Sequence, residues 1–115
     1  MARPTRPISW IKAARKDFEA FPDEVQLRIL QTLTIAAEGG KADIAKPFKG
    51  FGSGVFEVAF SYRGNAYRAI YAVQMGADIW VVHAFQKKSK TGIKTPREEI
   101  EVVRVRLRRL QEVLP

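Results

Sequence analysis

Three strand-like segments separated by only two short turns occupy the middle of the chain, and they constrain the fold more than any other feature. Residues 55–62, 66–74 and 79–86 are rich in β-branched and aromatic side chains. Tight turns fall between them, at Arg63-Gly64-Asn65 and at Gly76-Ala77-Asp78. Because turns this short join neighbouring antiparallel strands, the pattern predicts a three-stranded meander.

Two helices are predicted before the meander. Residues 10–21 place apolar side chains on one helical stripe, with Ser9 as a candidate N-cap. Pro22 ends this helix and can occupy the first position of a second one, which stops at Gly39-Gly40. The apolar stripe of the second helix comprises Val25, Ile29, Leu33 and Ala36, thickened by Leu30 and Ala37. A weak strand signal at Pro7-Ile8 adds an edge strand to the prediction.

The last segment has the clearest helical pattern. Thr95-Pro96-Arg97-Glu98 is typical of a capping box with proline at the first helical position. The apolar stripe that follows is Ile100, Val103, Leu107, Leu110 and Leu114, and the opposite side carries Arg104, Arg106, Arg108 and Arg109. The sequence therefore predicts one α+β domain over residues 1–115, with an N-terminal helical hairpin, a three- to four-stranded mainly antiparallel sheet and a C-terminal helix.

The charge balance points to an anionic partner. The chain has 20 lysine and arginine residues against 12 acidic ones, a net charge of +8, and a pI near 10.1. A field of this size attracts polyanions, so nucleic acid is the first candidate partner, anionic membrane the second and an acidic protein the third. A basic domain without such a partner is the alternative.

Several classes of protein and of site are disfavoured by what the sequence lacks. No apolar run is long enough to span a membrane, the basic N-terminus is not followed by the apolar region of a secretory signal, and there is no cysteine. We therefore expect a cytoplasmic protein without disulfides. With one histidine and no cysteine, the usual zinc and iron sites are not expected, and no phosphate-binding glycine loop or nucleophile elbow is found.

Cationic side chains are concentrated on and just after the strands. Those before the last strand are Lys46, Lys49, Arg63 and Arg68, and a run of lysines after it consists of Lys87, Lys88, Lys90 and Lys94. Such a run is typical of an edge that grips phosphate groups. Lysines also protect exposed sheet edges against aggregation, which is the structural alternative.

Three residues in the strands are candidates for chemistry. Arg68 lies in the middle of an apolar strand, where a guanidinium must be paired or reach a groove; Glu57 on the neighbouring strand is its expected structural partner. His83 is either a hydrogen-bonded structural histidine or a general base. Phe85 adjoins the lysine run and is a candidate for stacking on a base.

These segments together resemble the RelE/ParE toxin superfamily, most closely its phage-derived, HigB-like branch. The stretches that carry the resemblance are Glu57-Val58, Tyr67-Arg68-Ala69-Ile70-Tyr71, His83-Ala84-Phe85-Gln86-Lys87-Lys88-Ser89, and Thr95-Pro96 followed by Glu98, Glu99 and Ile100. The resemblance covers essentially the whole chain. It implies a compact toxin fold in which a sheet flanked by helices presents a concave basic face.

The resemblance also implies an activity and partners. Many members of the superfamily cleave mRNA on the ribosome, whereas ParE-type members poison gyrase. Their genes neighbour an antitoxin, which in this branch typically carries a helix-turn-helix DNA-binding domain. Carried over to this sequence, Arg68 would contact the scissile phosphate, and Lys87 and Lys88 would be the basic residues after the last strand.

We therefore predict a type II toxin that cleaves mRNA without a metal or other cofactor. The candidate catalytic residues are Arg68, Lys87, Lys88 and His83, and the candidate RNA-binding residues are Lys49, Arg63, Phe85, Lys90 and Lys94. Cations would stabilise the developing phosphorane charge, and His83 or a lysine would accept the proton of the attacking 2′-hydroxyl. The alternatives are a non-enzymatic poison of a protein such as gyrase and a basic nucleic-acid-binding module without toxicity.

Overall fold

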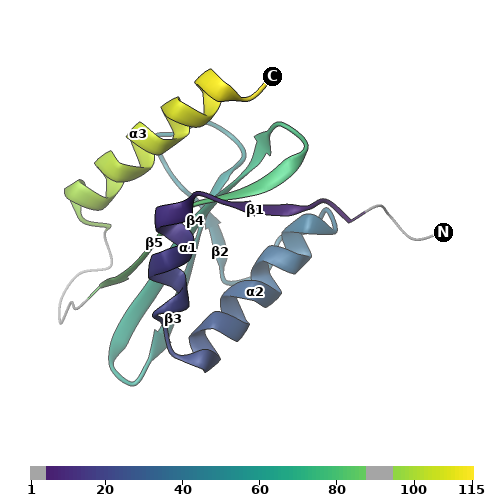
Figure 1. Cartoon of the computed structure of the whole chain (residues 1–115). Helices are drawn as coiled ribbons and strands as arrows, with labels where there is room; N and C mark the ends of the chain where they lie inside the picture. Colours follow the sequence, from purple (N-terminus) through teal and green to yellow (C-terminus); the bar gives the residue numbers. More distant parts are fainter. Residues whose placement is uncertain (1–4, 88–94) are drawn as a thin grey trace.

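The computed structural model describes residues 5–87 and 95–115. Its helices and strands follow in the order β1 (Ile8–Trp10), α1 (Lys12–Glu19), α2 (Asp23–Ala37), β2 (Ala45–Pro47), β3 (Val55–Tyr62), β4 (Asn65–Met75), β5 (Asp78–Lys87) and α3 (Arg97–Val113). Figure 1 shows the two N-terminal helices and the C-terminal helix arranged around a twisted sheet. The predicted α+β class, helical hairpin and C-terminal helix are confirmed.

The strands form one mixed sheet in the order β1-β5-β4-β3-β2. Strands β3, β4 and β5 pair antiparallel, as the two short turns predict. The weak signal at Pro7-Ile8 corresponds to β1, which pairs parallel to β5 through Ile8 opposite Ile79. A parallel edge strand can form here because two helices and three strands separate it in sequence from β5.

The strand count is the main difference from the sequence-based prediction, because five strands are described where three or four were expected. The unexpected strand, β2, consists of only Ala45, Lys46 and Pro47 and pairs antiparallel with β3. Three residues that include a proline carry no period-two pattern of their own. Their strand geometry comes from pairing with β3, which the sequence does not reveal.

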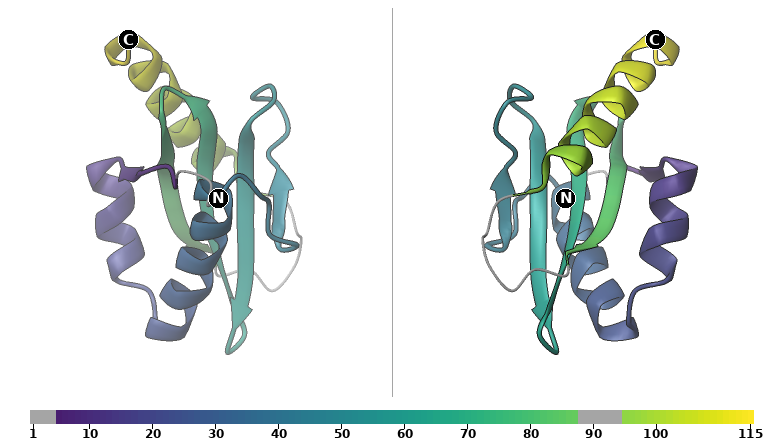
Figure 2. Two further views of the ribbon diagram at one scale, coloured as in Figure 1. Left: turned by 90° about the vertical axis from the view of Figure 1, so that its right-hand side faces the viewer. Right: turned by 90° about the vertical axis from the view of Figure 1, so that its left-hand side faces the viewer.

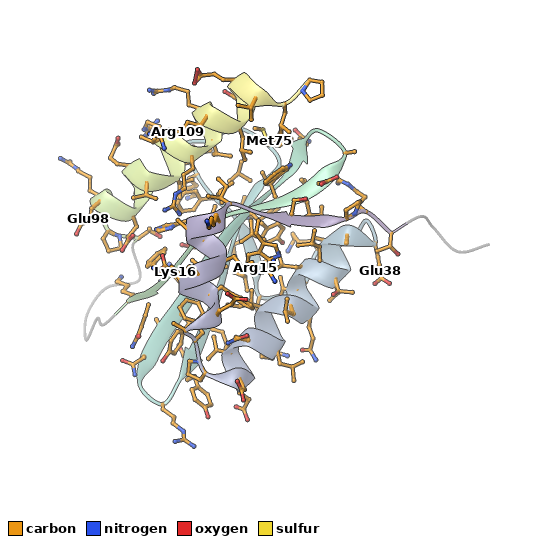
Figure 3. All side chains as sticks on the ribbon, viewed as in Figure 1. Arg15, Lys16, Glu38, Met75, Glu98 and Arg109 are labelled. Atoms are coloured by element: carbon orange, nitrogen blue, oxygen red, sulfur yellow. The ribbon has the colours of Figure 1, made fainter. Side chains whose placement is uncertain are left out.

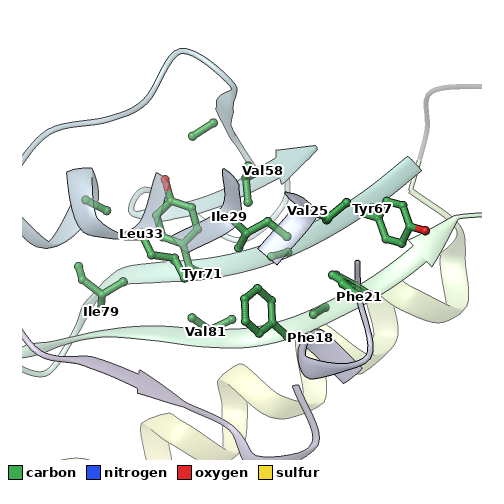
Figure 4. Packing of buried hydrophobic residues seen from close by; sticks show 14 of the residues in the cluster. Phe18, Phe21, Val25, Ile29, Leu33, Val58, Tyr67, Tyr71, Ile79 and Val81 are labelled. Atoms are coloured by element: carbon green, nitrogen blue, oxygen red, sulfur yellow. The ribbon is translucent and has the colours of Figure 1, made fainter. Parts of the chain in front are cut away.

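The sheet lies between two helical layers. Figure 2, which turns the molecule about the vertical axis, shows α1 and α2 along one side of the sheet and α3 on the other. The cluster on the α1/α2 side includes Phe18, Ile29, Val58 and Tyr71 (Figure 4). The cluster on the α3 side consists of Phe48, Val55, Ile70, Ala72, Val82, Phe85, Val103, Leu107 and Leu110. Successive residues of β4 alternate between these clusters, so the two faces of the strand are separately defined.

The turn between β3 and β4 consists of two residues in left-handed conformations. Arg63 has a φ of 51° and Gly64 a φ of 81°. Two successive positive φ values are typical of the tight hairpin turn whose twist matches that of its strands. The predicted turn is one residue too long, since Asn65 already pairs with Tyr62 as the first residue of β4.

The helix starts differ from prediction in three places. Ser9 is not an N-cap: it lies in β1, where its hydroxyl donates to Asp78 Oδ2, and Ile11 is the N-cap of α1. Pro22 is the N-cap of α2 rather than its first helical residue. Likewise Pro96 is the N-cap of α3, and the Thr95 hydroxyl donates to Glu57 Oε2 at 2.7 Å instead of capping the helix. In each case a hydroxyl bonded to a carboxylate, or the fixed φ of proline, moves the boundary by one or two residues.

Candidate nucleic-acid interface

The α3 side of the sheet is open over β3. Helix α3 packs against β5 and β4, whereas Ala59 and Ser61 of β3 are exposed. The strand register places Ala59 opposite Arg68 and Ser61 opposite Ala66, so these residues share one face. The candidate site lies on this exposed part of the sheet, next to the start of α3.

Arg68 lies at the centre of this face and is 8% exposed. Its Nη1 donates to Glu57 Oε1 at 3.0 Å and is 3.4 Å from Thr95 Oγ1. The expected pair with Glu57 is therefore present, and both side chains are largely buried. A buried guanidinium needs such a partner, because an unpaired charge away from water is costly.

A hollow of about 530 Å³ adjoins Arg68. It is lined by Asp43, Ile44, Lys46, Glu57, Ala59 and Arg68. Lys46 is exposed and lies opposite Glu57 in the register of β2 and β3. Its side chain therefore stands on the same face of the sheet, at the rim of the hollow. The hollow therefore combines two cations with two carboxylates, and its acidic members reduce the local positive charge.

Lys87 shares a face with Arg68. In the register of β4 and β5, Arg68 lies opposite Phe85 and Ala66 lies opposite Lys87, so Lys87 is two residues along β5 from the position opposite Arg68. Side chains two residues apart on a strand point to the same side of the sheet, so Lys87 is a diagonal neighbour of Arg68. The structure thus brings together two of the predicted catalytic residues.

His83 is 5% exposed and is held by α3 on both sides of its ring. Arg106 Nη1 donates to His83 Nδ1 at 3.1 Å and to the carbonyl of Val82 at 3.0 Å. Since an arginine can only donate, the ring proton lies on Nε2, which donates to Glu99 Oε1 at 2.8 Å. Burial lowers the pKa of His83 below its usual value of 6.5, so the neutral ring is favoured.

The other predicted RNA-binding residues are dispersed. Phe85 is 7% exposed and stacks on the His83 ring, so its aromatic face belongs to the core. Lys49 lies in the loop before β3 and Arg63 in the turn after it; both are exposed, at opposite ends of a strand of 8 residues, roughly 25 Å apart. The predicted residues Lys88, Lys90 and Lys94 lie outside the described residues.

Further cations are spread over the helices. Figure 3 labels Arg15 and Lys16 on α1 and Arg109 on α3, all of them exposed. These exposed groups add to the overall positive field of the protein.

The sequence-based prediction missed three residues that hold the candidate side chains. The sequence pattern predicts Thr95 as a helix cap, whereas its hydroxyl donates to Glu57. The pattern also places Arg106 on the far side of the last helix, whereas the structure shows that Arg106 reaches the sheet. Glu99 was noted only in the resemblance, whereas it pairs with His83. The only available signal was helical spacing: Glu99 and Arg106 are seven residues apart, and so lie on one face of α3.

Within residues 5–87 and 95–115, the structure brings together no group of three or more histidine, cysteine, aspartate or glutamate side chains that could hold a metal ion. The helices in the same ranges also include none that is long and apolar enough to cross a membrane.

Two comparisons with known proteins give a match. Residues 16–108 match the family described as Phage derived protein Gp49-like (DUF891). A search of curated proteins gives no match. Among solved structures, the chain is similar to one in the crystal structure of the toxin-antitoxin complex RelBE2 from Mycobacterium tuberculosis, with a TM-score of 0.50 and 15% sequence identity.

The structural match covers 74% of this chain and 94% of the mycobacterial one, and at this identity it concerns the fold alone. The family match, in contrast, extends over most of the sequence, including β3, β4, β5 and the residues of the candidate site. The protein therefore belongs to the phage-derived Gp49-like family and shares its fold with a chain of the RelBE2 toxin-antitoxin complex, in agreement with the resemblance found in the sequence.

Proposed function

We propose that this protein is the toxin of a toxin–antitoxin pair and that it cleaves mRNA during translation. The observation that carries the proposal is the placement of Arg68 and Lys87 as diagonal neighbours on one face of adjacent strands. That face is open at Ala59 and Ser61, so a nucleic-acid backbone could approach it. The net charge of +8 adds long-range attraction for RNA.

The proposed chemistry is an internal phosphoryl transfer. The 2′-oxygen of the ribose attacks the adjacent phosphorus, and the bond from phosphorus to the 5′-oxygen of the next nucleotide breaks. The products are a 2′,3′-cyclic phosphate and a 5′-hydroxyl, and one proton passes from the 2′-hydroxyl to a base while the leaving oxygen gains another. Arg68 and Lys87 would stabilise the charge that develops on the phosphorane oxygens.

Of the predicted proton acceptors, Lys87 fits this role better than His83. Both ring nitrogens of His83 are engaged by Glu99 and Arg106. The Lys87 ammonium stands on the Arg68 face, near the end of β5. In the proposal, His83 is a structural residue that fixes α3 against the sheet.

An antitoxin is the proposed protein partner. The mycobacterial chain of similar fold was crystallised as a toxin-antitoxin complex. We propose that a helix-turn-helix antitoxin encoded beside this gene binds the chain and blocks the Arg68 face. Light scattering of a mixture of the two proteins should show one complex. Two separate species at micromolar concentration would contradict this part of the proposal.

Inducible expression in bacteria tests the toxin function. Growth and incorporation of labelled amino acids should stop soon after induction and recover when the antitoxin is co-expressed. The variant Arg108→Ala is a suitable control, because it removes one exposed arginine of α3 away from the sheet face. Unimpaired growth in cells that contain soluble protein would contradict the proposal.

A non-enzymatic poison of a protein target is the second candidate. It is favoured by the ion pairs of two candidate catalytic residues, Arg68 with Glu57 and His83 with Glu99, which give both side chains a structural role. Growth arrest with intact mRNA would support this candidate, whereas cleaved mRNA would support the first.

A further inference from the structure

Thr95 joins the start of α3 to the Arg68 face through mutual contacts among three side chains, those of Thr95, Glu57 and Arg68. Its hydroxyl donates to Glu57 Oε2 at 2.7 Å, while Arg68 Nη1 donates to Glu57 Oε1 at 3.0 Å. The same Nη1 is 3.4 Å from Thr95 Oγ1. The neighbouring strands β3 and β4 and the residue before the α3 cap, which is 38 positions from Glu57, thus meet at one carboxylate.

The Thr95 hydroxyl occupies an unusual position for a residue in front of a helix. A threonine followed by Pro-Arg-Glu would normally bond to the backbone of the first helical turn. Here Pro96 is the N-cap and makes no side-chain cap hydrogen bond. The hydroxyl is instead committed to Glu57, where a hydrogen bond to a charged group contributes more than a neutral one.

The two oxygens of Glu57 have different donors, and this fixes the plane of the carboxylate. With Thr95 on Oε2, rotation of the carboxylate about its terminal bond would break one hydrogen bond. A fixed carboxylate holds Nη1 of Arg68, and so fixes the orientation of the planar guanidinium toward the hollow. Without the hydroxyl, Glu57 Oε2 loses this donor, while Oε1 can still accept from Arg68 Nη1.

We propose that Thr95 is a positioning residue for Arg68, acting through Glu57. This inference rests on the proposed RNA cleavage, because it assigns Thr95 a part in orienting the group that stabilises the transition state. Thr95 does not contact the substrate in this scheme. Its effect is on the geometry of Arg68, and misplacement of a catalytic group by about 1 Å can lower the rate roughly a hundredfold.

The test uses Thr95→Val, which removes the hydroxyl but keeps the charge and the approximate shape, and Thr95→Ser, which keeps the hydroxyl. Thr34→Val is the matched control, since Thr34 is exposed on α2 and its hydroxyl donates to the carbonyl of Leu30 in its own helix. Each variant is assayed for cleavage of translated mRNA, with separate determination of kcat and KM, and for thermal unfolding.

Thr95→Val should lower kcat by roughly tenfold to a hundredfold with KM within about twofold of wild type. Thr95→Ser and Thr34→Val should retain the wild-type kcat. Wild-type kcat in folded Thr95→Val, or a loss of kcat that Thr95→Ser does not restore, would overturn the inference. An inactive wild-type protein would contradict the proposed function instead.

A second readout does not depend on activity. In nitrogen-15 NMR spectra of the arginine side chains, the Arg68 guanidinium of the wild type should show hindered rotation, because Glu57 holds Nη1. Thr95→Val should increase the rotation rate at Arg68 and leave the other arginine signals unchanged. An unchanged Arg68 signal in the folded variant would overturn the inference even if RNA cleavage is not detected.

Discussion

Nη1 of Arg68 lies 3.0 Å from Oε1 of Glu57, and this ion pair joins β4 to β3 on the face of the sheet that α3 leaves open. The pair gives the arginine a structural partner in a position where a charge needs one. A guanidinium has five N–H donors, so pairing through Nη1 does not exclude a contact with phosphate. The two interpretations of Arg68, structural and catalytic, are therefore compatible and can be separated by mutation.

Arg68→Ala should abolish RNA cleavage and also lower the melting temperature. Loss of one preorganised donor to a developing oxyanion costs about 2.7–4 kcal/mol, or roughly a hundredfold to a thousandfold in rate. Loss of the ion pair leaves the Glu57 carboxylate in a largely buried site, which destabilises the fold. Growth arrest and thermal unfolding measured on the same variant distinguish the roles: a destabilised but fully toxic protein would show that Arg68 is only structural.

Lys87→Ala should weaken RNA binding more than Lys49→Ala. Lys87 lies on the Arg68 face, whereas Lys49 lies beyond the other end of β3. If Lys87 grips a phosphate, its removal should reduce the salt dependence of binding by about one ion. Binding titrations at several salt concentrations measure this, with Lys12→Ala on α1 as the control. Equal losses for all three lysines would indicate a general charge effect without a defined site.

The meander and the C-terminal helix could be predicted because their patterns are local. Strands β3 to β5 follow each other through tight turns, and the spacing of Val103, Leu107 and Leu110 is that of a buried helix face. The short strand β2 could not be predicted, since its geometry depends on β3. Leu30 was expected in the core but is 39% exposed, because α2 buries a narrower stripe than its apolar residues suggest.

The candidate site was predictable only in part. The pair of Arg68 with Glu57 follows from one charge of each sign on neighbouring strands. In contrast, the contacts of Thr95 with Glu57 and of Arg106 with His83 join residues that are 38 and 23 positions apart. Contacts over such separations depend on how α3 crosses the sheet, and helical periodicity does not specify that crossing.

The stability of the protein should fall as the pH decreases below about 6.5. Burial lowers the pKa of His83, so the unfolded chain binds a proton more readily than the folded protein does. The free energy of unfolding should therefore decrease from the unfolded-state pKa down to the folded-state pKa, and then level off. Urea unfolding between about pH 5 and pH 8 measures this.

His83→Gln is the control for this pH dependence. His83 is the only histidine in the sequence, so the variant should be insensitive to pH over most of this range. An unchanged pH profile in His83→Gln would show that another group is responsible.

Arg106→Met should destabilise the attachment of α3, whereas Arg108→Met should not. Arg106 bonds to the Val82 carbonyl and to His83, while Arg108 is exposed. Methionine keeps much of the apolar stem but leaves two buried acceptors without their donor, at a cost of about 1–3 kcal/mol. Urea unfolding of the two variants measures the difference. Equal stabilities would mean that the Arg106 contacts contribute little.

The proposed cleavage of mRNA is tested most directly by adding the purified protein to the translation of a defined mRNA in vitro. Primer extension locates the cuts, and chemical analysis identifies the ends that they leave. We expect discrete cuts with 2′,3′-cyclic phosphate and 5′-hydroxyl ends, lost in Arg68→Ala and retained in Arg108→Ala. Intact mRNA in reactions where the wild-type protein nevertheless stops translation would contradict RNA cleavage and identify a protein target instead.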